Sequence, residues 1–238
     1  MFERPHHRRI ERTLQLIRTD FLELNHAYFG GGTCIALQLR EYRESVDIDF
    51  LCNDASGYRQ IHEAVFAKAH AALCQTGTTL VGDLIRTRDA LRFFIDLQDG
   101  QRPVKCEIVR EGYLPPFSPG PKLAGVTTLR PEDLMASKLL ANTDRGLDRA
   151  LRFRDFFDVV MAGSAWPEQA PLAMAKAMSA YGESAKTALE KVAELLRDKQ
   201  DLRSEAYERL AVEHEARLMI DKILADTPRG ITHKIFGC

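Results

Sequence analysis

The sequence lacks the long apolar run that a membrane-spanning helix requires. No stretch of its 238 residues approaches the ~18–20 apolar residues of such a helix, and the basic first nine residues are not followed by the apolar core of a secretion signal. Net charge is also nearly absent, with 33 basic against 34 acidic residues. We therefore expect no membrane partner and no coating of nucleic acid by bulk charge, although a local basic groove remains compatible with this balance.

The sequence has few cysteines, and their spacing matches no paired-cysteine motif. The five cysteines lie far apart, no Cys-x-x-Cys occurs, and His214-Glu215 is not completed by a second histidine four residues after the first. These spacings argue against a disulfide framework and against a zinc site. We expect reduced thiols and a cytoplasmic protein.

Internal repeats and low-complexity segments are missing too, and the hydrophobic pattern divides the chain into two parts. In the first part it predicts helices over 8–25, 33–41 and 57–74, strands over 27–29, 46–51, 79–87, 91–97 and 103–109, and a proline-rich loop over 112–121. In the second it predicts only helices, over 131–144, 149–162, 167–181, 184–199 and 203–225. The expected organisation is an α+β core in residues 1–121 followed by a helical domain in residues 122–238 that completes the active-site cleft.

The most suggestive acidic motif is Asp47-Ile48-Asp49. Alternate residues of a strand share a face, so both carboxylates should point the same way while Ile48 points the other way. Two neighbouring carboxylates repel each other, and a divalent cation with oxygen ligands would remove that repulsion. A solvated strand end is the simpler alternative for this motif alone.

A glycine run, Gly30-Gly31-Gly32-Thr33, lies between a predicted strand and a predicted helix. Glycines in that position allow backbone N–H groups to approach a phosphate, and the start of the helix adds a positive dipole. The run is neither a P-loop nor a Gly-x-Gly-x-x-Gly fingerprint, because the residues that complete those motifs are absent. A tight turn without a ligand would need the same glycines.

A third carboxylate lies on the strand predicted over 103–109. Val104, Cys106 and Ile108 should share the apolar face, so Glu107 projects from the other face beside Lys105. If this strand neighbours the Asp47–Asp49 strand, three carboxylates converge as they do in two-metal group transfer. A surface strand bearing a Lys/Glu pair is the alternative.

The helical part carries a second polar group. Lys138 and Arg145 lie on one stripe of a helix, and Asp155 and Asp158 share a face of the next helix. The lysine could contact a triphosphate and the acids could orient it or the attacking hydroxyl. An ordinary network of ion pairs between helices would produce the same pattern.

The order and spacing of these motifs resemble the AbiEii/AbiGii family of nucleotidyltransferase toxins, over about residues 25–165. The resemblance implies a polymerase-β-like nucleotidyltransferase core with a mixed β-sheet and a C-terminal helical bundle. It also implies nucleotide-binding, metal-binding and catalytic residues. The nucleotide-binding ones are Gly31, Gly32, Thr33, Arg43, Ser45 and Lys138, the metal ligands are Asp47, Asp49 and Glu107, and the catalytic group is Asp47, Asp49, Lys138, Asp155 and Asp158. The glutamate at 107, where an aspartate is usual, suits a peripheral ligand.

The expected activity is Mg²⁺-dependent transfer of NMP from an NTP to an acceptor hydroxyl, with one or two Mg²⁺ ions. The resemblance implies an RNA acceptor such as the 3′ end of tRNA, with a protein hydroxyl as the alternative, and a cognate antitoxin as partner. Arg86, Arg88 and Arg92 could line an RNA groove or could form a solvated hairpin tip. Two other functions fit the same residues: a small-molecule nucleotidyltransferase of the antibiotic-modifying kind, and a non-catalytic nucleotide-binding module.

Overall fold

The chain divides into two compact units that do not follow the sequence order. A computed structural model describes residues 2–226 and 230–237. Met1–Gln38 and Ser45–Arg130 form one unit, which we call the sheet unit, and Leu39–Glu44 and Pro131–Cys238 form the other, the helical unit. A six-residue segment from the first third of the chain is therefore part of the helical unit.

The sheet unit is organised around a mixed β-sheet, as predicted. Within the described residues the sheet has eight strands, in the order β3-β5-β6-β2-β1-β8-β7 with β4 paired to β5. β2 runs antiparallel to β1 and parallel to β6, and this register places Asp49 opposite Gly30 on one side and opposite Glu107 on the other. The bounds are β1 (Ala27–Gly30), β2 (Ile48–Cys52), β3 (Thr79–Leu80), β4 (Ile85–Arg86), β5 (Ala90–Asp96), β6 (Val104–Arg110), β7 (Pro119–Leu123) and β8 (Val126–Leu129).

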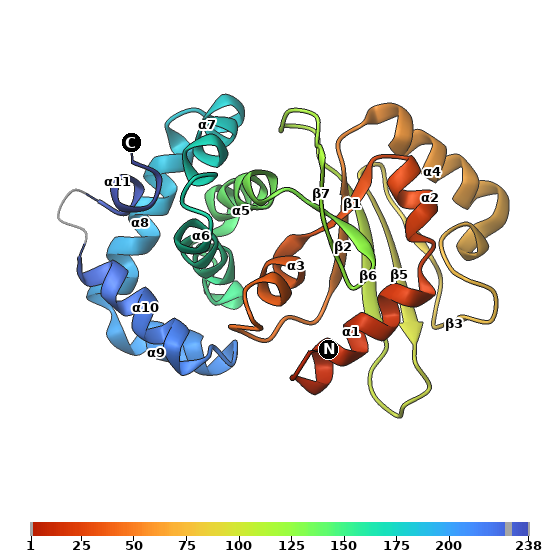
Figure 1. The fold of residues 1–238 in the computed structure, drawn as a ribbon, viewed down its shortest axis with the longest axis horizontal. Coiled ribbons are helices and arrows are strands. Elements are labelled where there is room, and N and C mark those ends of the chain that lie inside the picture. The colour runs from red at the N-terminus through yellow and green to blue at the C-terminus, as the bar shows by residue number, and fades with distance from the viewer. Residues whose placement is uncertain (1, 227–229, 238) are drawn as a thin grey trace. The chain divides into compact units, whose positions relative to one another are not determined.

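Helices cover both faces of this sheet. α1 (Pro5–Leu16), α2 (Thr19–Leu24) and α4 (Ala55–Lys68) lie on one face and α3 (Gly31–Gln38) on the other (Figure 1). β5 and β6 alternate buried and half-buried residues along their length, as expected for strands with one face in the core. Polar residues of β6 consequently share the other, half-buried face, where Glu107 lies.

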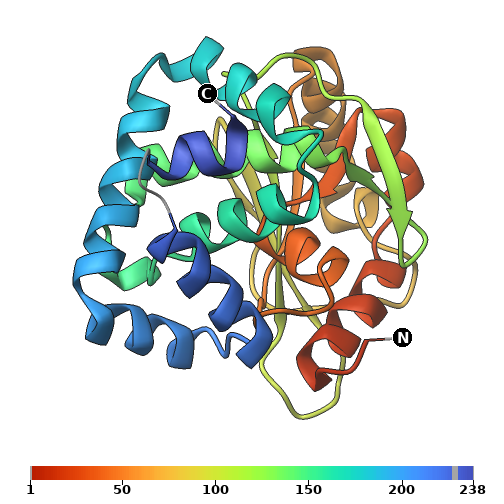
Figure 2. The ribbon, with the colours of Figure 1, turned by 60° about the vertical axis from the view of Figure 1, so that its left-hand side comes forward.

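The helical unit is built around α5. This helix (Pro131–Arg145) opens with proline and then Glu132 and Asp133, which suit the positive end of a helix. It packs against α6 (Arg154–Ala165), α7 (Ala170–Tyr181) and α8 (Ser184–Asp198) (Figure 2). α9 (Gln200–Arg209), α10 (His214–Ala225) and α11 (Ile231–Phe236) complete it. None of the helices in the described part of the chain is long and apolar enough to cross a membrane.

Four predicted helices were wrong in their continuity. The helix predicted over 149–162 is interrupted at Arg152 and Phe153, which have positive φ, so a short 3₁₀ turn, Arg149–Leu151, is separate from α6. The helix predicted over 8–25 breaks at Ile17 and Arg18, because their backbone pairs with the segment at Leu73 and Cys74 instead of continuing the helix. The helix predicted over 203–225 breaks between α9 and α10, where Ala211 has a positive φ and Val212 is buried. The helix predicted over 57–74 ends at Lys68 and is followed by a short 3₁₀ turn, Ala69–Ala72.

Two predictions about the sheet were also wrong. The single strand over 79–87 is instead the pair β3 and β4, separated by Gly82, which adopts a positive φ. The end of the predicted loop over 112–121 belongs to strand β7, which forms a hairpin with β8. β7 is an edge strand, where prolines such as Pro119 and Pro121 are tolerated because one side of the strand needs no hydrogen-bond partner.

Candidate active site

The glycine turn and the acidic strand meet in the sheet unit. Gly31 has a φ of +70°, a conformation that side chains with a Cβ rarely adopt. A Cβ at this position would also collide with the carboxylate of Asp49, so the absence of a side chain at Gly31 leaves the space that Asp49 fills. The glycine turn thus brings the beginning of α3 against the acidic strand.

Thr33 connects this turn to the residues before β2. Its hydroxyl lies 2.8 Å from the Ser45 hydroxyl and donates to the backbone carbonyl of Asp47. The backbone N–H of Ser45 donates to Nε2 of the buried His7 at 3.2 Å. The structure therefore brings together Gly31, Thr33, Ser45, Asp47 and Asp49. His7 is a supporting residue that sequence reasoning missed, because a lone histidine carries no motif.

Glu107 lies beside these acids but is already paired. Arg92 donates to one of its carboxylate oxygens at 2.7 Å, and Lys105 forms an ion pair with the other. Burial alone would raise the pKa of Glu107, but Lys105 and Arg92 outweigh it and lower that pKa. Lys105 also lies 3.6 Å from Oδ2 of Asp47.

The acidic residues do not form a closed metal cage. Across the described ranges, no group of three or more His, Cys, Asp or Glu side chains is arranged to hold a metal ion. Mg²⁺ does not require such a group, since it is commonly bound by one or two carboxylates, water and substrate phosphates. Asp47, whose side chain is 31% exposed, and Asp49 are a donor set of that kind.

The predicted polar residues of the helical unit form a buried chain of ion pairs. Nζ of Lys138 lies 2.7 Å from Oδ1 of Asp155 and 2.9 Å from Oδ2 of Asp158. Arg145 donates to Asp155 at 2.8 Å. Arg43, from the segment Leu39–Glu44, donates to both oxygens of Asp158, at 2.8 and 2.9 Å. We call these five side chains the cationic cluster, because three cations surround two carboxylates.

The protonation states of this cluster follow from its pairing. Burial would lower the pKa of Lys138, but Asp155 and Asp158 outweigh it, so that pKa is raised and the lysine stays charged. Burial would raise the pKa of Asp155, but Lys138 and Arg145 hold it well below its usual value. Asp155 is therefore a weak base, and this favours an orienting role for it over proton abstraction.

Tyr42 is a further member that sequence reasoning missed. Its hydroxyl donates to Asp158 and accepts a hydrogen bond from Nε of Arg43 at 3.2 Å. Burial raises its pKa well above the usual value, and the charge of Asp158 adds to this effect. The sequence offered only its adjacency to Arg43 as a signal.

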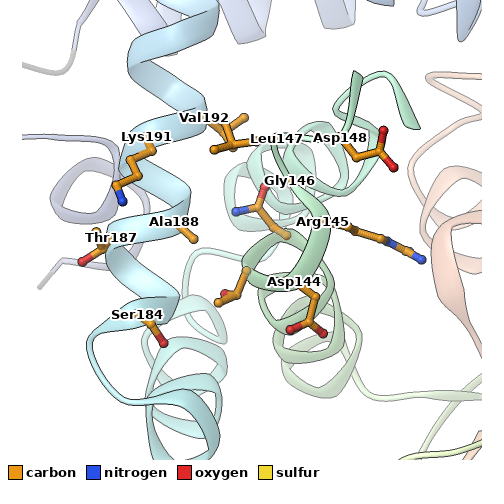
Figure 3. Close-up of a pocket in the computed structure, with 12 residues that line it drawn as sticks. Asp144, Arg145, Gly146, Leu147, Asp148, Ser184, Thr187, Ala188, Lys191 and Val192 are labelled. Carbon is orange, nitrogen blue, oxygen red and sulfur yellow. The ribbon is translucent and has the colours of Figure 1, made fainter. Parts of the chain in front are cut away.

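A pocket of about 600 Å³ lies between the C-terminal end of α5 and the first half of α8. Figure 3 shows Ser184, Thr187 and Lys191 on the α8 side, with Arg145 and Asp148 pointing away from them. Arg145 therefore contributes its backbone side to this pocket and its guanidinium to the cationic cluster. Asn142, which also lines this pocket, is 1% exposed, and neither polar atom of its side chain has a hydrogen-bond partner among the described residues.

A solved structure shares the α+β fold of this chain. The crystal structure of JHP933 from Helicobacter pylori is similar at a TM-score of 0.53 and 15% identity, covering 100% of this chain and 95% of that one. A second crystal structure from H. pylori matches at 19% identity and a TM-score of 0.47, covering 94% and 96% of the two chains. No curated protein matches this chain.

The family follows from the family model of the AbiEii nucleotidyl transferase toxins of type IV toxin–antitoxin systems, which matches residues 15–232. The chain belongs to this family, and it is a nucleotidyltransferase. The resemblance noted from the motifs is thereby confirmed, and the matched range also covers most of the C-terminal helices, in which no motif was found.

Proposed function

We propose that this protein transfers NMP from an NTP to an RNA hydroxyl, with the nucleotide and a divalent cation bound at the glycine turn and acidic strand. The observation that carries the proposal is the register of β1 with β2, which sets Asp49 opposite Gly30 at the start of the glycine turn. The N-terminal end of α3 and carboxylates for a cation therefore lie together, as binding of a metal-complexed triphosphate requires.

In this proposal Asp47 and Asp49 hold Mg²⁺, with Glu107 behind them. When bound, the ion would neutralise phosphate charge and lower the pKa of the attacking hydroxyl. Backbone N–H groups at Gly31 and Gly32 would bind phosphate oxygens, and the Thr33–Ser45 pair holds the turn against the Asp47 backbone. Most of the catalysis by the chain itself would then be positioning and charge neutralisation.

In the helical unit, we assign a phosphate-binding role to the cationic cluster. Its three cations exceed its two carboxylates, and the Arg145 side chain is 42% exposed, so it offers an accessible positive charge. Lys138 is 8% exposed and bonded to both acids. Asp155 and Asp158 would therefore orient Lys138, Arg145 and Arg43 toward a developing negative charge.

The choice of RNA as the acceptor rests on a basic pocket in the sheet unit. Arg59, Arg88 and Arg110 line this pocket of about 420 Å³ together with His62. Beside it, Arg86 lies over the ring of Phe66, which is 79% exposed. Arginines beside an exposed aromatic ring can bind backbone phosphates and stack on a base. Arg92, in contrast, is bonded to Glu107.

The acceptor we propose within RNA is the 3′ end of tRNA. A cognate antitoxin encoded with the toxin would be the regulatory partner. We expect the enzyme to meet tRNA and the antitoxin in the cytoplasm.

Parallel labelling reactions with each of the four NTPs test the activity. Purified full chain is incubated with Mg²⁺ and one of four α-labelled NTPs, with and without total cellular RNA, and the double variant Asp47→Ala/Asp49→Ala runs beside it. Label on a discrete RNA band that the variant does not produce is the expected result. Label on protein alone, or no label on RNA despite Mg²⁺-dependent binding of NTP, would overturn the RNA acceptor.

A matched pair of variants tests the basic pocket. Arg59 and Lys68 lie on the same helix, α4, but of these two only Arg59 lines the pocket. Arg59→Ala should weaken RNA binding and reduce the salt dependence of the binding constant by about one unit of slope, while Lys68→Ala should not. Equal effects of the two variants would argue against this pocket as the RNA site.

A further inference from the structure

Lys105 connects two of the acidic residues in the sheet unit. Its ammonium forms an ion pair with Oε2 of Glu107 and lies 3.6 Å from Oδ2 of Asp47, which precedes the neighbouring strand β2. The parallel register of β2 and β6 sets Asp49 opposite Glu107. The lysine thus lies where the carboxylates of two adjacent strands converge, rather than in open solvent.

Arg92, the other cation paired with Glu107, contacts fewer of these acids than Lys105 does. Arg92 bonds only Oε1 of Glu107 among these acids and comes from the opposite side, on β5. Both carboxylate oxygens of Glu107 therefore have a cationic partner already. The two cations differ in one respect that can be tested: Lys105 bridges to Asp47, whereas Arg92 does not.

We propose that the Lys105 ammonium occupies the place of a second divalent cation between Asp47 and Glu107, so that the enzyme uses one metal ion, held by Asp47 and Asp49. This inference rests on the proposed function. One divalent ion, the Lys105 ammonium and the Arg92 guanidinium together carry four positive charges, which already offset the three carboxylates without a second ion. Two-metal transferases reach a comparable balance with a second ion placed near the first.

Counting bound Mn²⁺ ions tests this assignment without any measurement of activity. Free Mn²⁺ is followed by its electron paramagnetic resonance signal during titration of the full chain. Wild type should bind one ion per chain. Lys105→Met should bind two, because removal of the ammonium leaves room for a second ion between Asp47 and Glu107. Arg92→Met, the matched control, should still bind one.

A double variant separates ligand loss from general charge effects. Lys105→Met/Glu107→Gln should return to one ion, because the second ion would need Glu107, and Glu107→Gln alone should leave wild-type stoichiometry unchanged. Lys105→Gln, which keeps a polar side chain at this 29% exposed position, repeats the test if Lys105→Met does not fold.

Each other outcome has a distinct meaning. Two ions on the wild type, or one ion on both Lys105 variants, would overturn the inference while leaving the proposed function intact. A second ion gained equally by Arg92→Met would also overturn it, since a bridge to Asp47 would then be irrelevant. No ion on the wild type would overturn both the inference and the proposed metal site.

Discussion

Asp47 and Lys105 in the sheet unit keep 31% and 29% of their side chains exposed, whereas Asp158 and Lys138 in the helical unit keep 0% and 8%. Both pairs join opposite charges, but the surroundings differ. Partly exposed charges are screened by water and remain available to a cation. Buried charges have lost their hydration and depend on their partners. The same residue types are therefore accessible to solvent and ligands in one unit and enclosed by their ion-pair partners in the other.

Removal of one buried acid should give the largest effect. Asp158→Ala leaves the cations of Arg43 and Lys138 without the carboxylate they share, and we expect a loss of about 3–5 kcal/mol in the free energy of unfolding. Urea denaturation measures it. Glu168→Ala, at an exposed position of the same unit, is the control and should change stability by less than ~0.5 kcal/mol. Equal, small changes in both would remove the contrast between the units.

The sheet unit should show the opposite balance of activity and stability. Asp47→Asn together with Asp49→Asn should lower nucleotidyl transfer by about 10²–10³-fold, by analogy with the loss of one preorganised electrostatic contact. The unfolding free energy should change by less than ~1 kcal/mol, since the substitution relieves repulsion between neighbouring acids. A large loss of stability here would mean that these acids are structural, as in the cationic cluster.

Alanine substitutions at two glycines with positive φ distinguish the cost of a strained backbone from the cost of a steric collision. Gly31 faces the Asp49 carboxylate, whereas a methyl group at Gly77 would have no described atom within 4 Å, and their φ angles are +70° and +87°. Alanine at either site should cost about 1–2 kcal/mol for the left-handed conformation. Gly31→Ala should cost roughly 1–3 kcal/mol more and displace Asp49. Equal losses in thermal unfolding would contradict the close approach.

The smallest expected effect is a gradual change with pH in the stability that Asp155 contributes. The pKa of Asp155 is lowered on folding, so its contribution to stability is present above about pH 4, the pKa of an unfolded Asp, and is lost as the pH falls through the folded value. The difference in unfolding free energy between wild type and Asp155→Asn should shrink from pH 6 to pH 3. The raised pKa of Lys138 acts only at alkaline pH, so it leaves this window unchanged. A constant difference would contradict the pairing.

Much of the sheet unit could be predicted from the sequence because its signals are local. The alternation of β6 and the spacing of Asp47 and Asp49 are readable from neighbours in the chain, as is the glycine turn. The break at Ile17 was missed because a distant partner at Cys74 decides it. The strand β7 was missed because its prolines are typical of a loop, although it pairs with the adjacent β8.

For the helical unit, the sequence predicted the polar residues of the candidate site but not their burial or all of their partners. Lys138, Asp155 and Asp158 were selected as a group, and the structure brings them together. Their burial and the identity of Arg43 and Tyr42 as partners depend on tertiary packing that no local pattern encodes.

Because Leu39–Glu44 belongs to the helical unit, recombination between related genes is constrained. Arg43 and Asp158 are 115 positions apart in the chain yet neutralise each other. A recombination event at the junction of residues 130 and 131 would transfer the helices without Arg43, and a relative lacking a cation at that position would receive an acid with an incomplete set of partners. The two stretches of gene must therefore diverge in step, and exchange of the C-terminal half alone is expected to be disfavoured among related toxins.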